Sequence, residues 1–153
     1  MRNFWIFCHL AGFTMWLGGG LGAMFVSLAN KQAPRDQLAT VARSLAAVYR
    51  KIIGPGAALV VISGLILTMQ LMAALGAGGG APISPWLLWM QGAGLIGAAL
   101  VLVILLPAAS RLARLDPVAQ APAFDAVRTR LRLFGAITGI LGIVALVSGA
   151  MLR

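Results

Sequence analysis

The sequence predicts an all-α fold: a polytopic membrane protein whose four transmembrane helices form one antiparallel bundle. Two observations predict it. Of the 153 residues, 61% are hydrophobic and only 10% are charged, whereas soluble domains average about 45–50% apolar and about 25% charged residues. The apolar residues also gather in four long runs, separated by polar or glycine-rich connections. This composition excludes a soluble enzyme, a disordered protein and a nucleic-acid-binding module.

Each run is close to the ~20 residues that a helix needs to cross the hydrocarbon of a bilayer. No run contains Asp, Glu, Lys or Arg, and we expect the four to form a single transmembrane domain over residues 1–153. They are Phe4–Leu28, Ile52–Leu75, Trp86–Ala109 and Leu133–Leu152. The first run is longer than the apolar core of about 7–15 residues in a signal peptide, so we expect a retained span.

The connections between the runs carry their own signals. The glycine-rich residues 76–82 predict a turn, and Pro85 suits the first turn of the third helix. Gly54-Pro55-Gly56 predicts a kink or the first ordered turn of the second helix. Apolar residues at helical spacing precede the second and fourth runs, interleaved with basic residues. These amphipathic stretches either lie on the membrane, extend the helix inward, or protrude from the bilayer and pack together.

The basic residues assign the orientation of the bundle. Five lie in residues 29–51 and five in residues 110–132, so these two connections hold ten of the 12 Lys and Arg residues. The positive-inside rule places both connections in the cytoplasm and both termini on the periplasmic side of a bacterial inner membrane. The net charge of +9 is therefore a topology signal. We expect anionic lipid headgroups, and no nucleic acid, as its partner.

Four polar side chains, one from each run, are expected in one layer of the outer leaflet: His9, Gln70, Gln91 and Ser148. At about 1.5 Å per residue, His9 lies about 8 Å inside the outer end of its run, and the others lie at similar depths. Because an unsatisfied polar group is costly in hydrocarbon, we expect these side chains to face inward and meet. Proton pumps and ion-coupled transporters place ionisable residues within their spans, so a transporter with a charged relay is not expected.

Soft ligand atoms are concentrated in the same outer half. His and Met ligate haem iron in many cytochromes, and Met and Cys favour Cu(I). His9 is therefore a candidate ligand for haem or copper, with Met90 or Met69 as a second ligand. The alternative is a structural histidine that hydrogen-bonds Gln91 or Gln70, with methionines that only fill gaps.

Trp86 and Trp89 share a helix face near the outer boundary of the third run. Interfacial tryptophans of this kind commonly anchor a membrane protein. Trp86 is also a candidate roof for a flat cofactor.

Small residues four apart recur in the runs, a spacing that lets helix backbones approach closely in lipid. We expect them to pack within the bundle, with a homodimer face as the alternative. The pairs are Gly18/Gly22, Gly135/Gly139 and Ala93/Gly97.

One pattern is more specific. The first run reads His9-x6-Trp16-Leu17-Gly18-Gly19, and the second opens with Arg50-Lys51-Ile52-Ile53-Gly54-Pro55 and then reaches Gly64. In these stretches the sequence resembles the small four-helix bacterial membrane proteins grouped around copper-resistance protein D and the HemJ type of protoporphyrinogen oxidase. Over the whole chain, the resemblance extends to the number of spans and the charge of the loops.

The resemblance implies two activities. In HemJ-type proteins the helix-one histidine is associated with haem binding, and His9 occupies that place. Those enzymes also use a membrane-embedded lysine, where this sequence has Gln91 in the third run. For copper-resistance-type proteins the implied role is copper handling at the inner membrane, and this chain would correspond to the compact four-helix part of that longer protein.

Three functional hypotheses follow. The first is a haem- or porphyrin-associated membrane protein, with haem b or a porphyrin held through His9. The second is a non-catalytic subunit or assembly factor of a larger membrane complex, motivated by the glycine-rich faces and the few reactive groups. The third is copper binding or transfer at the periplasmic side, through His9, Met69 and Met90.

Overall fold

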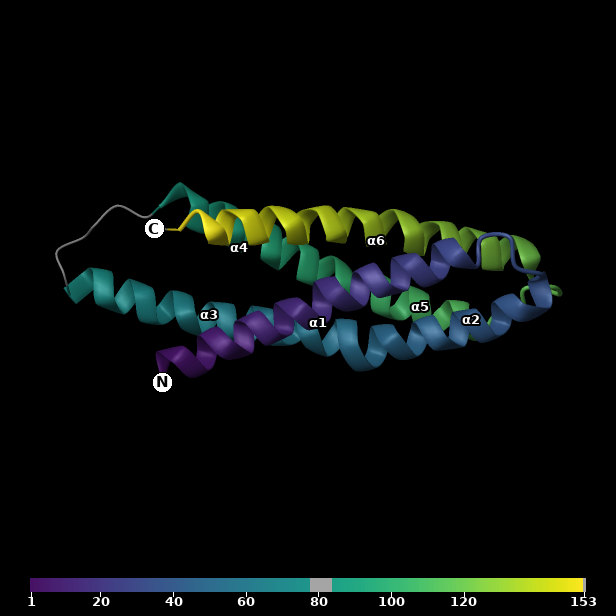
Figure 1. The fold of residues 1–153 in the computed structure, drawn as a ribbon, viewed down its shortest axis with the longest axis horizontal. Coiled ribbons are helices and arrows are strands. Elements are labelled where there is room, and N and C mark those ends of the chain that lie inside the picture. The colour runs from purple at the N-terminus through teal and green to yellow at the C-terminus, as the bar shows by residue number, and fades with distance from the viewer. Residues whose placement is uncertain (78–83, 153) are drawn as a thin grey trace.

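In the computed structural model, which describes residues 1–77 and 84–152, every element is helical and there is no strand (Figure 1). The all-α prediction is confirmed, and Pro85 lies in the first turn of its helix as expected. Most of the turn predicted at residues 76–82 lies outside the described residues. The elements are α1 (Arg2–Ala29), α2 (Arg35–Val48), η1 (Tyr49–Ile53), α3 (Gly54–Ala77), α4 (Pro85–Leu100), η2 (Val101–Leu105), α5 (Leu106–Leu112) and α6 (Ala121–Ala150).

Four continuous helices are long and apolar enough to cross a membrane: Arg2–Ala29, Arg35–Gly76, Pro85–Leu112 and Ala121–Ala150. The second joins α2, η1 and α3 into 42 residues, a length of about 63 Å at about 1.5 Å per residue. This is about twice the ~30 Å of bilayer hydrocarbon. The amphipathic stretch before the second run is thus a continuous extension of that helix.

Two turns of π-helix, η1 and η2, stand at the same distance before a proline. Gly54 directly precedes Pro55, and its N–H bonds to the carbonyl of Tyr49. In the same way, Leu106 directly precedes Pro107, and its N–H bonds to the carbonyl of Val101. A proline inside a helix has no N–H, and its ring clashes with the carbonyl four residues back. The widened turn accommodates the ring, so the helix that begins at Arg35 continues through Pro55. Gly54-Pro55-Gly56 is therefore not the first ordered turn of the second helix, which was one of the two alternatives that the sequence predicted.

The helices associate as two pairs, α1 with α3 and α4 with α6. In the first pair the backbones meet at Gly12 and Gly56, where a Cβ atom on Gly56 would lie 2.8 Å from both the Cβ of Met15 and the backbone nitrogen of Trp16. Only glycine permits this approach. The two pairs meet where the buried ring of Trp16 lies over Gly97 of α4.

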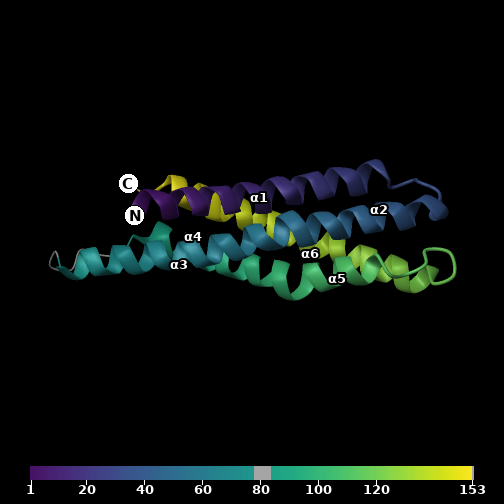
Figure 2. The ribbon, with the colours of Figure 1, turned by 90° about the horizontal axis from the view of Figure 1, so that it is seen from below.

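The packed core lies in one half of the molecule. It is built from the inward faces of α2 and α5, the second half of α1, the first half of α6, both π-helical turns, and the ends of α3 and α4 next to those turns. The helices of this half lie side by side in both views (Figures 1 and 2). Its largest fully buried side chains are Phe124, Ile53, Leu105, Leu112 and Val101. The two amphipathic stretches, in α2 and at the start of α6, therefore both contribute to this core, and both helices contact α5.

Ionic groups gather at this same end, which we call the basic end. It contains α2, α5, the start of α6 and the connections at residues 30–34 and 113–120, while both chain termini lie at the opposite, terminal end (Figure 1). Arg35 joins the start of α2 to α6 through a 2.9 Å ion pair with Asp125. It also donates to the carbonyl of Pro117 at 3.1 Å.

The predicted small-residue pairs behave differently from one another. Ala93 and Gly97 are buried as expected, with Gly97 under Trp16. Gly18 and Gly22 face open space, with no atom within 4 Å of a Cβ built on either. The expectation that they pack within the bundle is therefore wrong. The spacing of glycines on one helix does not fix which way that helix is rotated.

Candidate functional site

His9 lies between α1 and α3 and is held by one ring nitrogen. Its Nδ1 is 3.1 Å from the carbonyl oxygen of Val60 and 3.1 Å from Oγ of Ser63. The Ser63 hydroxyl donates to carbonyls of its own helix, at Leu59 and Val60. Since that hydroxyl has a single proton, the consistent assignment is that Nδ1 carries the ring proton and donates to Val60 and Ser63.

This assignment leaves Nε2 of His9 as the basic nitrogen. Within residues 1–77 and 84–152, Nε2 has no hydrogen-bond partner. A histidine that ligates a metal almost always donates its other N–H to a carbonyl, carboxylate or water, which fixes the tautomer and the ring orientation. His9 has this arrangement.

The absence of a side chain at Gly64 makes room for the ring. A Cβ built on Gly64 would lie 3.1 Å from Cε1 of His9. On the next turn of α3, Thr68 donates to the carbonyl of Gly64 at 2.9 Å and accepts a 2.7 Å bond from Nε2 of Gln91 on α4. Ser63 and Thr68 thus form a polar row along α3. His9 of α1 contacts this row at Ser63, and Gln91 of α4 contacts it at Thr68.

The expected contacts of His9 with the glutamines are not formed. Ser63 and Val60 take the place of Gln91 and Gln70 as its partners. Gln70 lies seven residues beyond Ser63 on α3, which is about 10 Å along the axis. Ser148 is buried at 2% exposure on α6. The structure thus brings Gln91 and His9 to one row of α3 residues and does not bring Gln70 to His9.

The two methionines proposed as further ligands face other surroundings. The Met69 side chain is 72% exposed, and the sulfur of Met90 lies beside Gly149 of α6, 3.2 Å from where a Cβ would stand. In the part of the chain that the structure describes, no three His, Cys, Asp or Glu side chains are grouped so that they could hold a metal ion. The structure therefore does not bring either methionine to His9 as a second ligand.

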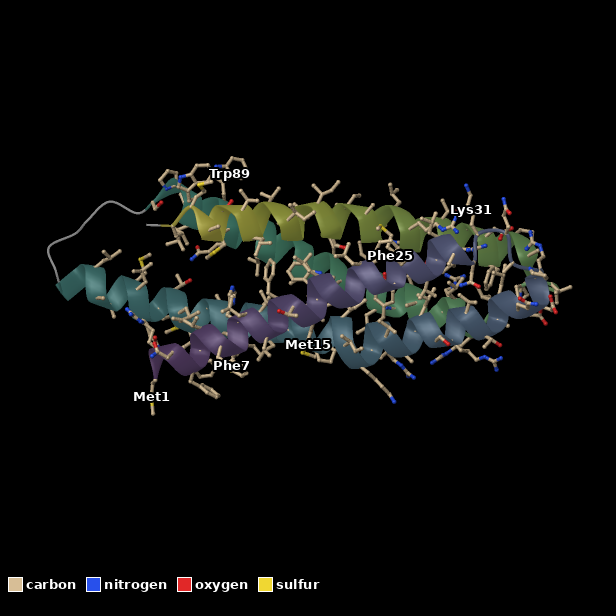
Figure 3. All side chains as sticks on the ribbon, in the orientation of Figure 1. Met1, Phe7, Met15, Phe25, Lys31 and Trp89 are labelled. Carbon is tan, nitrogen blue, oxygen red and sulfur yellow. The ribbon has the colours of Figure 1, made fainter. Side chains whose placement is uncertain are left out.

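Trp86 and Trp89 lie at the start of α4 and are 45% and 65% exposed. Figure 3 shows Trp89 on the outer surface near the terminal end. Both positions suit interfacial anchors. Trp86 has no described contact with His9.

Sequence reasoning missed Ser63 and Thr68. Serine and threonine in apolar helices usually bond back to a carbonyl of their own helix, so neither residue type draws notice by itself. The available signal was their position on one face of α3 with Val60 and Gly64, at helical spacing.

No family model matches the chain, and neither the curated proteins nor the solved structures contain a match.

Proposed function

We propose that the chain is a multi-pass protein of the bacterial inner membrane that holds haem b or a porphyrin through His9. Its basic end faces the cytoplasm and both termini face the periplasm, as the positive-inside rule requires. The four long apolar helices support the membrane location. The basic residues gathered at one end support the orientation.

The observation that carries the haem proposal is the fixed ring of His9. Its Nδ1–H is held by the Val60 carbonyl on a neighbouring helix, and its Nε2 is left without a protein partner among the described residues. A histidine held in this way would coordinate haem iron through Nε2, with its tautomer and ring orientation fixed by the hydrogen bond at Nδ1. Haem iron held in this way supplies electron-transfer or ligand-binding chemistry.

The test is an absorbance spectrum. The protein, expressed with ample haem and purified in mild detergent, should show a Soret band that His9→Ala removes. Cys8→Ala is the matched control, because its free thiol neighbours His9 on the same helix and lies about 100° away around the helix. A wild-type protein without Soret absorbance, or a band that survives His9→Ala, contradicts the proposal.

Copper has less support from the geometry. A Cu(I) site needs two or three soft ligands that converge, whereas Met69 points outward and Met90 packs beside Gly149. Under the haem proposal, Met69→Leu with Met90→Leu leaves the Soret band unchanged. Stoichiometric Cu(I) binding that this double substitution abolishes would favour copper instead.

A second candidate function, subunit or assembly factor of a larger membrane complex, is favoured by the outer face of α1. Gly18 and Gly22 are both exposed, and the exposed side chains of Leu21 and Phe25 flank them. A small-xxx-small face of this kind is suited to a helix of another protein in the membrane. Co-purification of a partner from native membranes, lost in Gly18→Leu, tests this function.

A further inference from the structure

A cavity of about 570 Å³ lies between α1 and α6 on the half of the molecule that holds the basic end. Along α1 its wall runs from Trp16 to Leu28, with Lys31 just beyond the helix, and along α6 from Phe124 to Ile143. The α1 wall is about 18 Å long at about 1.5 Å per residue. One leaflet of hydrocarbon is about 15 Å deep, half of the ~30 Å core. The groove is therefore long enough for a lipid acyl chain.

Small residues create this groove. Gly20 of α1, and Gly135 and Gly139 of α6, line it. A Cβ built on Gly20 or Gly139 would meet no atom within 4 Å. Side chains on the rim, such as Leu21 and Ile140, are more than half exposed. The apolar side chains that line the groove lack dispersion contacts on its open side unless another molecule fills the groove.

The end of the groove next to the basic end is positively charged. Lys31, Arg128 and Arg132 all line it, and Figure 3 shows Lys31 in the connection that follows α1. Arg128 donates to the carbonyl of Asn30 at 3.0 Å, and Arg132 donates to that of Ser27 at 3.4 Å.

These bonds leave most of each guanidinium available. A guanidinium has five N–H donors in a planar fork, and this fork binds phosphate oxygens in pairs. The neighbouring carboxylate, Asp125, is paired with Arg35. The end of the groove thus keeps a net positive charge.

We propose that this groove binds one anionic phospholipid, with an acyl chain between α1 and α6 and the phosphate at Lys31, Arg128 and Arg132. The inference rests on the proposed membrane location with the basic end in the cytoplasm. In that orientation the cations lie at the headgroup level of the inner leaflet, where anionic lipids are found. An apolar groove with cations only at its headgroup end is complementary to an amphiphile whose charge is at one end.

The test uses full-length protein extracted from vesicles of equal parts phosphatidylglycerol and phosphatidylcholine with the same acyl chains. Native mass spectrometry then counts the lipids that remain bound. We expect one retained phosphatidylglycerol per chain. Arg128→Gln with Arg132→Gln should lower its retention at least about tenfold, the effect of losing charge-assisted hydrogen bonds. Arg111→Gln with Arg114→Gln removes the same charge outside the groove and should change little.

A second pair of variants tests the acyl-chain half of the site. Gly139→Leu fills the groove and should abolish retention of the lipid, whereas Gly92→Leu, at a position with open surroundings outside the groove, should not. Circular dichroism checks that both variants keep their helices, and the arginine variants test the site independently if Gly139→Leu does not fold.

Three results would overturn the inference: equal retention of both lipids by the wild type, phosphatidylglycerol retention unchanged in the arginine variants, or a lipid-free dimer that Gly139→Leu dissociates. Two other measurements show separately whether the proposed function fails. A protein absent from the membrane fraction contradicts the membrane location, and a missing Soret band contradicts only the haem proposal.

Discussion

The two ends of the molecule are built differently. At the basic end, α2, α5 and parts of α1 and α6 enclose large buried side chains such as Phe124 and Leu112. At the terminal end the pair α1/α3 diverges from the pair α4/α6 (Figure 1), and large side chains such as Phe7 and Met69 are exposed. The hydrogen bond from Gln91 to Thr68 connects the two pairs there.

The sequence of α2 explains this difference. Its outward residues are polar, while Leu38, Ala42 and Leu45 are buried. This is the pattern of a helix with one face in water, where burial of apolar surface drives packing. Helices surrounded by lipid lack that driving force and associate through close backbone contacts and hydrogen bonds. We therefore expect the basic end to provide most of the stability and the terminal half to provide the His9 site.

The largest effect should come from Phe124, which is 1% exposed at the centre of the basic end. Phe124→Ala should lower the free energy of unfolding by about 3–5 kcal/mol, through lost burial and the cavity that is left. Phe7→Ala, at a side chain that points outward in Figure 3 and is 68% exposed, should change it by about 0.5 kcal/mol or less. Denaturant unfolding in detergent, followed by circular dichroism, measures both. Equal losses would mean that the two ends contribute alike.

The next largest loss of stability is expected where α1 and α3 cross, at Gly56. In Gly56→Ala the new Cβ would be 2.8 Å from the Trp16 backbone nitrogen, so the two helices must separate, at about 1–3 kcal/mol. The same separation should loosen His9 from Val60 and weaken the Soret band. Gly18→Ala is the control, because its surroundings are open and alanine favours the helix by up to about 1 kcal/mol. A Gly56→Ala protein as stable as the Gly18→Ala protein would show that the close crossing is not required.

A smaller effect is expected at the bond between the two pairs. Gln91→Leu and Thr68→Val should each lower the free energy of unfolding by about 1 kcal/mol, the net value of one hydrogen bond. The double variant should lose less than the sum, because neither substitution then leaves an unpaired partner. A double-mutant cycle measures this coupling. Strict additivity would mean that the 2.7 Å contact does not hold the pairs together.

The smallest change in stability is expected from Asp116, in the connection at residues 113–120 of the basic end. The Asp116 carboxylate accepts N–H bonds from Val118 at 2.8 Å and Ala119 at 3.0 Å, and these bonds hold the pKa of its carboxyl below the ordinary value of 3.8. Because the pKa is lower in the folded state, the stabilisation is complete above pH 3.8. It is lost as the pH falls through the folded-state value.

Thermal unfolding between pH 7 and pH 3 measures this effect. Asp116→Asn should reduce the decline in melting temperature at the acid end, by a small amount because the carboxyl is fully exposed. An identical pH dependence in the variant and the wild type would show that these bonds do not contribute.

Part of the candidate site was predictable from the sequence. His9 is the one histidine in the chain, and its place in an apolar run predicted that it would need a partner. The partners themselves were not predictable. The expected layer assumed that all runs are aligned at their outer ends, which would set His9 level with Gln70. The close crossing at Gly12 and Gly56 instead places His9 beside Val60 and Ser63.

By itself the sequence determined the helical class, the four long apolar segments and the segregation of charge into two connections, because length, composition and the needs of the backbone in hydrocarbon fix these properties. The rotation and axial position of each helix were decided only by the tertiary structure. A helix that is apolar on all sides gives no sign of which face its neighbours cover. That choice depends on which small residues a neighbouring backbone approaches: the backbone of α1 lies against Gly56, and no described neighbour lies against Gly18.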